Sequence, residues 1–416
     1  MMWCCAFSKA QRHIVFSDEI ASLQVVAGTR WQDMPMIRLN GNEVLNISFD
    51  DLSHAYRRLT YTITHLDADW TPSESLFASD YISGFQSGLT IEDNEESINT
   101  IQDYTHYRLQ IPNKECRIRM SGNYRLDIKD DNNGDKPMAT VFFMVYEEEV
   151  GVGLTYSEDT DIDVRKNHQQ VSLSVEFSRL HPTNPREQLK GYVIQNGRWD
   201  NARRLPMAPR ITQNKLEWVH CRDLIFEAGN EYHKFEILDI HRNSLNVENN
   251  AWDGDVWHTV LWPDYRRSSY VYDETPKGSF YIRNSDNQES DITSEYVMVH
   301  FILQSEPLPY RFFVNGTWTN DRFLEKYEMF YDYDRKVYEC VTPLKYGYYS
   351  YQYLMLPEND IVDGSPEEDE NAGRNLSEPL IPPTEGSFYE TRNRYSALIY
   401  YRGNGDRTDR LVGVYQ

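Results

Sequence analysis

The stretch YRRLTYTITHLDADW, residues 56–70, contains the pattern that decides the fold of this chain. Apolar and aromatic side chains recur at every second position from Leu59 to Ile63, followed by His65. Alternate side chains of an extended strand lie on one face, so this pattern is typical of a strand whose one face is buried in a sheet. The run ends in Asp-Ala-Asp-Trp-Thr-Pro, and aspartate and proline favour turns. The stretch therefore predicts a strand that leaves its sheet at a polar turn.

The same strand pattern recurs outward from this stretch in both directions. Short alternating runs are separated by turn-forming residues, and Asn40-Gly41 and Asn196-Gly197 each predict a tight turn between two strands. Helical periodicity is weak throughout. The sequence therefore predicts an all-β protein of tandem immunoglobulin-like or early-set β-sandwich domains in series.

Shifts in composition predict the domain organisation. A short apolar run near the N-terminus ends in Ser8-Lys9-Ala10, and small residues at these spacings suit signal peptidase. A cytosolic N-terminus is the alternative. The predicted units are 1–18, the remnant of a signal peptide and an N-terminal extension; 19–149, an N-terminal β-sandwich; 150–290, a central β-sandwich with a linker; and 291–416, a C-terminal early-set sandwich similar to glycogen-binding modules, with an acidic loop near 357–385.

Composition excludes several classes of function. The 416 residues carry a formal net charge of −23, which repels nucleic-acid phosphates. The chain has no apolar run long enough for a membrane-spanning helix. Apart from Cys4 and Cys5, which lack a lipobox, the cysteines are isolated, so neither a disulfide framework nor a zinc site is predicted. These isolated residues are Cys116, Cys221 and Cys340.

One short motif raises the question of metal chemistry. On an extended strand, His65, Asp67 and Asp69 would share one face, and such a set could bind a divalent metal in a hydrolase. In the structural alternative, Trp70 closes the end of a core, the aspartates accept hydrogen bonds from turn amides, and Pro72 stops strand pairing. The chain contains no GxSxG, P-loop, GxGxxG or HExxH motif. The structural interpretation is favoured, with no enzyme activity, no catalytic residue, no metal and no cofactor.

The aromatic residues suggest a second kind of site. In YGYYSYQY, residues 346–353, alternation places the tyrosines at odd-numbered positions on one face. Core packing is one interpretation of these rings, and a stacking surface for a sugar or a protein is the other. The candidate contact residues are Trp318, Tyr346 and Tyr349.

Several longer strings stand in a set order along the chain. They are MIRLN, ISFDDL, YTITHLDADW, YTHYRLQIPN, SGNYRLDI, DKPMATVFFMV, IQNGRWDNA, VHFIL and YYSYQYLMLP, followed by EGSFYETRNRYSALIYYR and DRLVGV. In this order and spacing, the chain resembles the plug protein family of the Bacteroidetes type IX secretion system. Where that family usually has a cysteine before Asp-Ala-Asp-Trp, this chain has Leu66.

The resemblance implies a role. Members of the family are soluble, exported to the periplasm and not enzymes. They dock on the large outer-membrane translocon barrel and close its periplasmic mouth while no substrate passes. The C-terminal unit also resembles sugar-binding early-set sandwiches, which makes a periplasmic carbohydrate-binding accessory protein the alternative. In that resemblance Gln352 stands where the sugar-binding modules usually have lysine.

Overall fold

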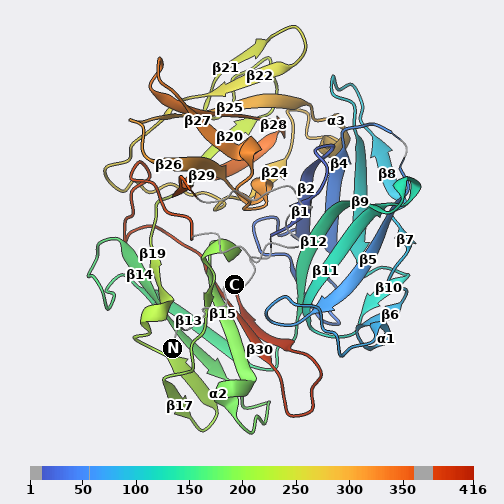
Figure 1. Cartoon of the computed structure of the whole chain (residues 1–416), viewed down its shortest axis with the longest axis vertical. Coiled ribbons are helices and arrows are strands. Elements are labelled where there is room, and N and C mark those ends of the chain that lie inside the picture. Colours follow the sequence, from blue (N-terminus) through green and yellow to red (C-terminus); the bar gives the residue numbers. More distant parts are fainter. Residues whose placement is uncertain (1–11, 56, 360–377) are drawn as a thin grey trace.

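The computed structural model describes residues 12–55, 57–359 and 378–416 (Figure 1). Most of the segment interpreted as a signal-peptide remnant and most of the predicted acidic loop lie outside the described residues. Strands dominate the fold, as predicted for an all-β protein. The helices are short, and none in the described ranges is long and apolar enough to cross a membrane. They are α1 (Ala78–Tyr81), α2 (Pro185–Gln188) and α3 (Ser290–Thr293).

The first sandwich contains two facing sheets and a small additional ribbon. One sheet has the order β1 (Ile14–Val15), β12 (Lys136–Tyr146), β11 (Gly122–Asp130), β5 (Leu59–Leu66), β7 (Leu89–Thr90), with β3 (Met36–Arg38) also on β12. The other sheet has the order β2 (Ile20–Ala27), β4 (Leu45–Asp51), β9 (Thr105–Ile111), β8 (Asp93–Glu96). The ribbon pairs β6 (Ile82–Gly84) with β10 (Cys116–Ile118).

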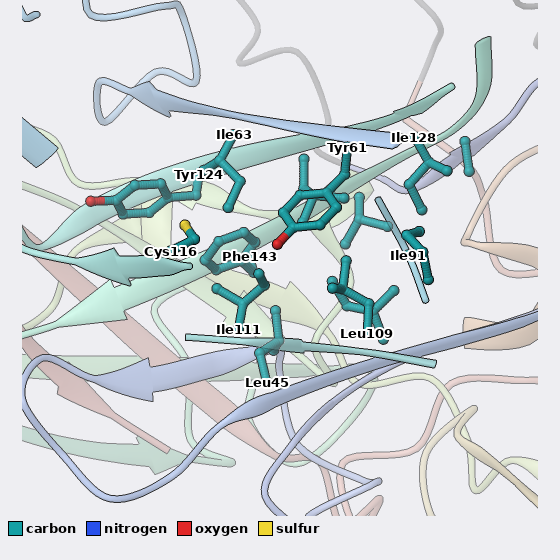
Figure 2. Packing of buried hydrophobic residues seen from close by; sticks show 14 of the residues in the cluster. Leu45, Tyr61, Ile63, Ile91, Leu109, Ile111, Cys116, Tyr124, Ile128 and Phe143 are labelled. Atoms are coloured by element: carbon teal, nitrogen blue, oxygen red, sulfur yellow. The ribbon is translucent and has the colours of Figure 1, made fainter. Parts of the chain in front are cut away.

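Alternating apolar residues of both sheets fill the first core (Figure 2). Tyr61 and Ile63 of β5 are buried, as the opening alternation predicts. The ring of Tyr124 stacks on Phe143, with 5.2 Å between ring centroids. Cys116 lies free in this core, and burial raises the pKa of its thiol to about 11.

The second sandwich draws strands from the middle and from the end of the chain. One sheet has the order β13 (Gly151–Ser157), β14 (His168–Glu176), β18 (Lys215–Trp218), β17 (Arg210–Thr212), with β19 (Ile225–Glu227) also on β14. The facing sheet has the order β16 (Arg203–Arg204), β15 (Leu189–Gln195), β30 (Tyr395–Tyr401), β31 (Arg410–Tyr415).

The third sandwich is built from ten strands linked by hydrogen bonds around one core. Eight of them follow one path: β20 (His233–Ile237), β29 (Gly347–Pro357), β26 (Tyr310–Asn315), β27 (Glu328–Asp332), β28 (Val337–Lys345), β25 (Tyr296–Gln304), β22 (Trp257–Leu261), β21 (Val247–Trp252). In addition, β23 (Asp264–Tyr265) pairs with β25, and β24 (Phe280–Ile282) pairs with β29.

This strand pairing differs from the expected division between 150–290 and 291–416. The last two strands pair with β15, and Figure 1 shows β30 in red beside β15 in green. The C-terminal part of the expected central unit, including its linker, supplies β20 to β24 of the third sandwich instead. The physical reason is that β30 is buried along almost its full length and needs a neighbour on each side. Apolar periodicity does not say which sheet provides those neighbours.

Candidate functional site

The THLDADW motif does not bring its three polar residues together. Strand β5 ends at Leu66, and the amide of Asp67 donates to the carbonyl of Thr71 at 2.8 Å in the turn that follows. His65 is buried, with its Nδ1 2.9 Å from Ser73 Oγ. Because the strand ends early, the alternation that would align the three side chains is lost.

His65, Asp67 and Asp69 are therefore not arranged around a common point, as a metal site would require. Asp69 is exposed and accepts hydrogen bonds from the amide and hydroxyl of Thr71, at 3.1 and 2.6 Å. Burial lowers the pKa of His65 below its usual value. Within the described ranges, no group of three or more His, Cys, Asp or Glu side chains could hold a metal ion.

Asp67 instead connects the first sandwich to the loop between β30 and β31. Its Oδ1 accepts hydrogen bonds from Thr408 Oγ1 at 2.5 Å and from the amide of Asp409 at 3.2 Å. In return, Asp409 Oδ2 accepts one from the amide of Ala68 at 3.2 Å. Burial alone would raise the pKa of Asp67, but the hydrogen bonds from Thr408 and Ser73 lower it below its usual value. We call this reciprocal pairing of residues 67–68 with residues 408–409 the DADW clasp.

Trp70 completes the motif at the point where the three sandwiches meet. Its backbone has a φ of +65°, a left-handed conformation that bulky residues rarely adopt. In this position its indole contacts Trp199 of the second sandwich in a T-shaped arrangement, with 5.1 Å between centroids. The same indole lines a cavity of about 150 Å³ that Gln24 of the first sandwich and Thr317 of the third also line. The strained backbone thus places a large ring at the junction of all three units.

The aromatic residues predicted to contact a ligand or partner lie in the third core. Trp318, Tyr346 and Tyr349 are 7%, 8% and 1% exposed. The Trp318 indole stacks on Phe301 at 5.6 Å and donates to the carbonyl of Ser350 at 3.1 Å. The Trp318 ring also contacts Tyr327 and Tyr349. The three candidate rings are thus part of the third core, and their contact with a ligand or partner stays a prediction. The tyrosines at odd-numbered positions of β29 share a buried face, as alternation predicts.

A buried ionic cluster joins the first and third sandwiches. Asp50, at the end of β4, accepts hydrogen bonds from Lys345 Nζ and Tyr296 Oη, each at 2.6 Å. Its other oxygen lies 2.6 Å from His106 Nδ1. The Lys345 ammonium group also lies 4.1 Å from the centroid of the Tyr104 ring. Burial lowers the pKa of Lys345, and the charge of Asp50 opposes that shift. Every charge in this cluster therefore has a partner.

A second cluster holds the segment that returns from β29 to β30. The His233 ring lies between two carboxylates, with Nδ1 2.9 Å from Asp264 Oδ1 and Nε2 2.9 Å from Glu385 Oε1. On the other side of this segment, Gln169 of β14 donates to the carbonyls of Tyr389 and Thr391 at 2.8 and 2.7 Å. The returning segment is thus fixed to the second and the third sandwich at once.

Sequence reasoning missed these two clusters, although one signal was available. Asp50 and His106 lie on the outer faces of β4 and β9, where alternation predicts solvent exposure. They are buried because the third sandwich covers that sheet. A carboxylate and a histidine at equivalent strand positions indicate pairing but not the partner across the interface.

Comparison with known proteins identifies relatives of the first sandwich and of the whole fold. Residues 20–147 match the family described as Type 9 secretion system plug protein 1st domain. A crystal structure of a hypothetical protein from Parabacteroides merdae is 37% identical, covers 97% of this chain and 98% of its own, and superposes with a TM-score of 0.89. No curated protein matches the chain. The match to the first sandwich carries the identification: the chain belongs to the plug protein family of the type IX secretion system.

Proposed function

We propose that this protein is the plug subunit that closes the periplasmic opening of the type IX translocon barrel while no substrate is passing. In this proposal the chain lies in the periplasm, after export by a signal peptide, and associates with the outer membrane through the barrel. The observation that carries the proposal is the family match over residues 20–147. A role in type IX secretion as a structural component follows from the family itself.

The interfaces between the sandwiches support a closing role. A plug must keep its shape when it is pressed against an opening, so its domains must not move relative to one another. Here the DADW clasp joins the first and second sandwiches, and the cluster around Asp50 joins the first and third. Breaking a buried ion pair by removing one partner costs about 3–5 kcal/mol. Such contacts favour one rigid body over three linked domains.

The surface charge supports binding to a basic partner. With a formal net charge of −23, the chain repels other acidic surfaces and associates most readily with basic ones. Attraction between exposed charges is screened by salt. We therefore expect association with the translocon to weaken as ionic strength rises.

A reconstitution experiment tests the proposal. The tagged protein, with an export signal, is produced in cells that carry the translocon and is purified from solubilised outer membranes. A plug is expected to co-elute with one very large barrel protein, and to do so less at high salt. Liposomes containing the barrel alone should leak a fluorescent dextran, and adding the purified protein should stop the leak. Co-elution without any effect on leakage would leave a subunit of the system that is not its plug.

A further inference from the structure

Strand β13 is a free edge of the second sandwich. It pairs with β14 on one side along its whole length, from Gly151 opposite Glu176 to Ser157 opposite Gln170. On its other side, none of its main-chain groups makes a backbone hydrogen bond within the described ranges. A row of N–H and C=O groups is therefore free to pair with another strand.

This edge lacks the protective features that edge strands usually carry. Natural edges are short, charged, bulged, interrupted by proline or covered. The sequence of β13, GVGLTYS, is seven residues long and has no charge and no proline. Its pairing with β14 shows no register shift.

Other edges in the described part of the chain have such features. Strand β17, at the opposite edge of the same sheet, has only three residues and begins with an arginine. Strand β8 reads DNEE, and β21 contains Glu248 and a register shift. Strand β31 is partly covered, because its carbonyls at Leu411 and Val412 accept hydrogen bonds from the amides of Glu147 and Glu149. Strand β2, an edge of eight uncharged residues, has a register shift in its pairing with β4. Among the edges compared, β13 alone lacks every one of these features.

We propose that β13 is an acceptor site at which a partner protein adds an extended segment as a further strand of the sheet. Main-chain pairing would provide the affinity, and the side chains beside β13 would select the segment. This inference does not rest on the proposed function, because any protein that supplies a suitable segment can be the partner.

The two faces of β13 define the chemistry of that segment. Leu154 is buried toward the core, and Tyr156 on the same face is 43% exposed although its ring contacts Tyr395 at 5.3 Å. An added strand with apolar residues on this face would cover Tyr156. On the outer face, Gly151 and Gly153 have no side chain; a Cβ at Gly153 would lie 2.9 Å from Ser174 Oγ, whereas one at Gly151 would make only ordinary contact. An aromatic side chain of a neighbouring strand can cover the backbone at Gly151.

Acidic residues flank β13 at both ends and favour basic residues at the two ends of the added segment. Glu148 and Glu149 precede the strand, and Glu158 and Asp159 follow it. Glu148 already pairs with Arg38 at 2.9 Å and Asp159 with Arg165 at 3.3 Å, so Glu149 and Glu158, which have no ion pair among the described residues, supply most of the attraction. Basic residues at both ends of the added strand would be attracted by these carboxylates. The same charges disfavour a second copy of this chain as the occupant, because acidic ends would meet acidic ends in either strand direction. The occupant is thus a segment of another protein, with an uncharged apolar and aromatic middle and basic ends.

A designed peptide tests this site on the full-length protein. The probe is fluorescein-labelled Arg-Val-Tyr-Val-Thr-Val-Tyr-Val-Arg, and its binding is followed by fluorescence anisotropy. Hydrogen exchange should show new protection over residues 151–157. A peptide with the same side chains but with N-methyl groups on alternate amides cannot pair through its main chain and should not bind. Equal binding of both peptides, no binding of either, or no protection of β13 would overturn the proposal.

Two variants locate the site. The double variant Thr155→Lys, Ser157→Lys places charges on the exposed face of β13 without filling its core side and should weaken binding about tenfold, or ~1.4 kcal/mol. Thr212→Lys on β17 makes the same kind of change at the opposite edge of the same sheet and should leave binding unchanged. Equal losses in both would contradict a site at β13. A concentration-dependent dimer that only the double variant abolishes would assign the edge to a second copy and overturn the choice of partner.

Discussion

The ammonium group of Lys345 lies 2.6 Å from the carboxylate of Asp50, although 295 positions separate the two residues in the chain. Both side chains are almost fully buried, at 1% and 0% exposure. A buried charge is tolerated only with close partners, and Asp50 also has His106 and Tyr296 within hydrogen-bond distance. The contact between the first and third sandwiches is therefore a polar cluster in which each charge depends on the others.

Replacing the lysine tests this dependence. Lys345→Met keeps the length of the side chain but leaves the Asp50 carboxylate buried without its cation. We expect the free energy of unfolding to fall by about 3–5 kcal/mol. Urea unfolding followed by tryptophan fluorescence measures the change.

Two further variants separate the ion pair from general damage. Lys136→Met, on an exposed position of β12, should change stability by less than about 0.5 kcal/mol. Adding Asp50→Asn to Lys345→Met should recover part of the loss, because a neutral amide costs less to bury than a lone charge. If the double variant is less stable than Lys345→Met, the charge of Asp50 is not the source of the loss.

The two aspartates of the DADW motif should behave differently when each is replaced by alanine. Asp67→Ala removes the acceptor for Thr408 and for the amide of Asp409, and hydrogen bonds to charged groups contribute about 1.5–3 kcal/mol each. We expect a loss of about 2–3 kcal/mol and faster hydrogen exchange in residues 402–409. Asp69→Ala affects an exposed turn and should cost about 1 kcal/mol or less. Equal losses, or unchanged exchange in that loop, would contradict the clasp.

Local sequence pattern predicted the elements of this fold better than their partners. The alternation before Leu66 predicted strand β5. It also predicted which face of β5 is buried, because the side chains of a half-buried strand alternate between core and solvent. The Asn40-Gly41 turn did not produce a hairpin, since β3 and β4 join different sheets. A two-residue turn favours hairpin pairing, but burial of both flanking strands in facing sheets decided the outcome.

The candidate sites were harder to predict because they depend on contacts between sandwiches. The sequence around Trp318 does not distinguish a ring that stacks on a ligand from one that stacks on Phe301 in the core. The partner of Asp50 lies in the third sandwich, and nothing near Asp50 in the sequence points to it. Such long-range pairs are set by the way domains pack together, which local periodicity does not encode.

Trp318 offers a test of the predicted ligand or partner contact. Trp318→Ala removes a nearly fully buried ring that stacks on Phe301, so we expect a loss of about 3–5 kcal/mol in the free energy of unfolding. Glucans added to the unmodified protein should cause no quenching that depends on Trp318, because this ring is only 7% exposed. Saturable quenching that disappears in Trp318→Phe would restore the sugar-binding hypothesis.

The raised pKa of Asp321 predicts how the free energy of unfolding depends on pH. Burial raises the pKa of this half-buried carboxyl group from its usual 3.8 to about 6, and the negative charge of Asp200 adds to the shift while Arg198 opposes it. Below pH 4 the carboxyl group is protonated in both the folded and the unfolded state. The folded state then buries a neutral group, so stability does not carry the penalty of a buried charge. Between pH 4 and 6 the unfolded chain releases this proton more readily, so stability falls as pH rises through the folded pKa.

Replacing the carboxyl group with a neutral amide should remove this penalty. Asp321→Asn is expected to raise the free energy of unfolding at pH 7.5 by up to about 2 kcal/mol, reduced from the full shift because the side chain is partly exposed to solvent. At pH 4 the variant and the natural protein should differ little. The exposed Asp135→Asn serves as the matched control and should change stability at neither pH. The measurement is urea unfolding at both pH values. A gain at pH 4 as large as that at pH 7.5 would show that packing, and not the charge of Asp321, limits stability at this position.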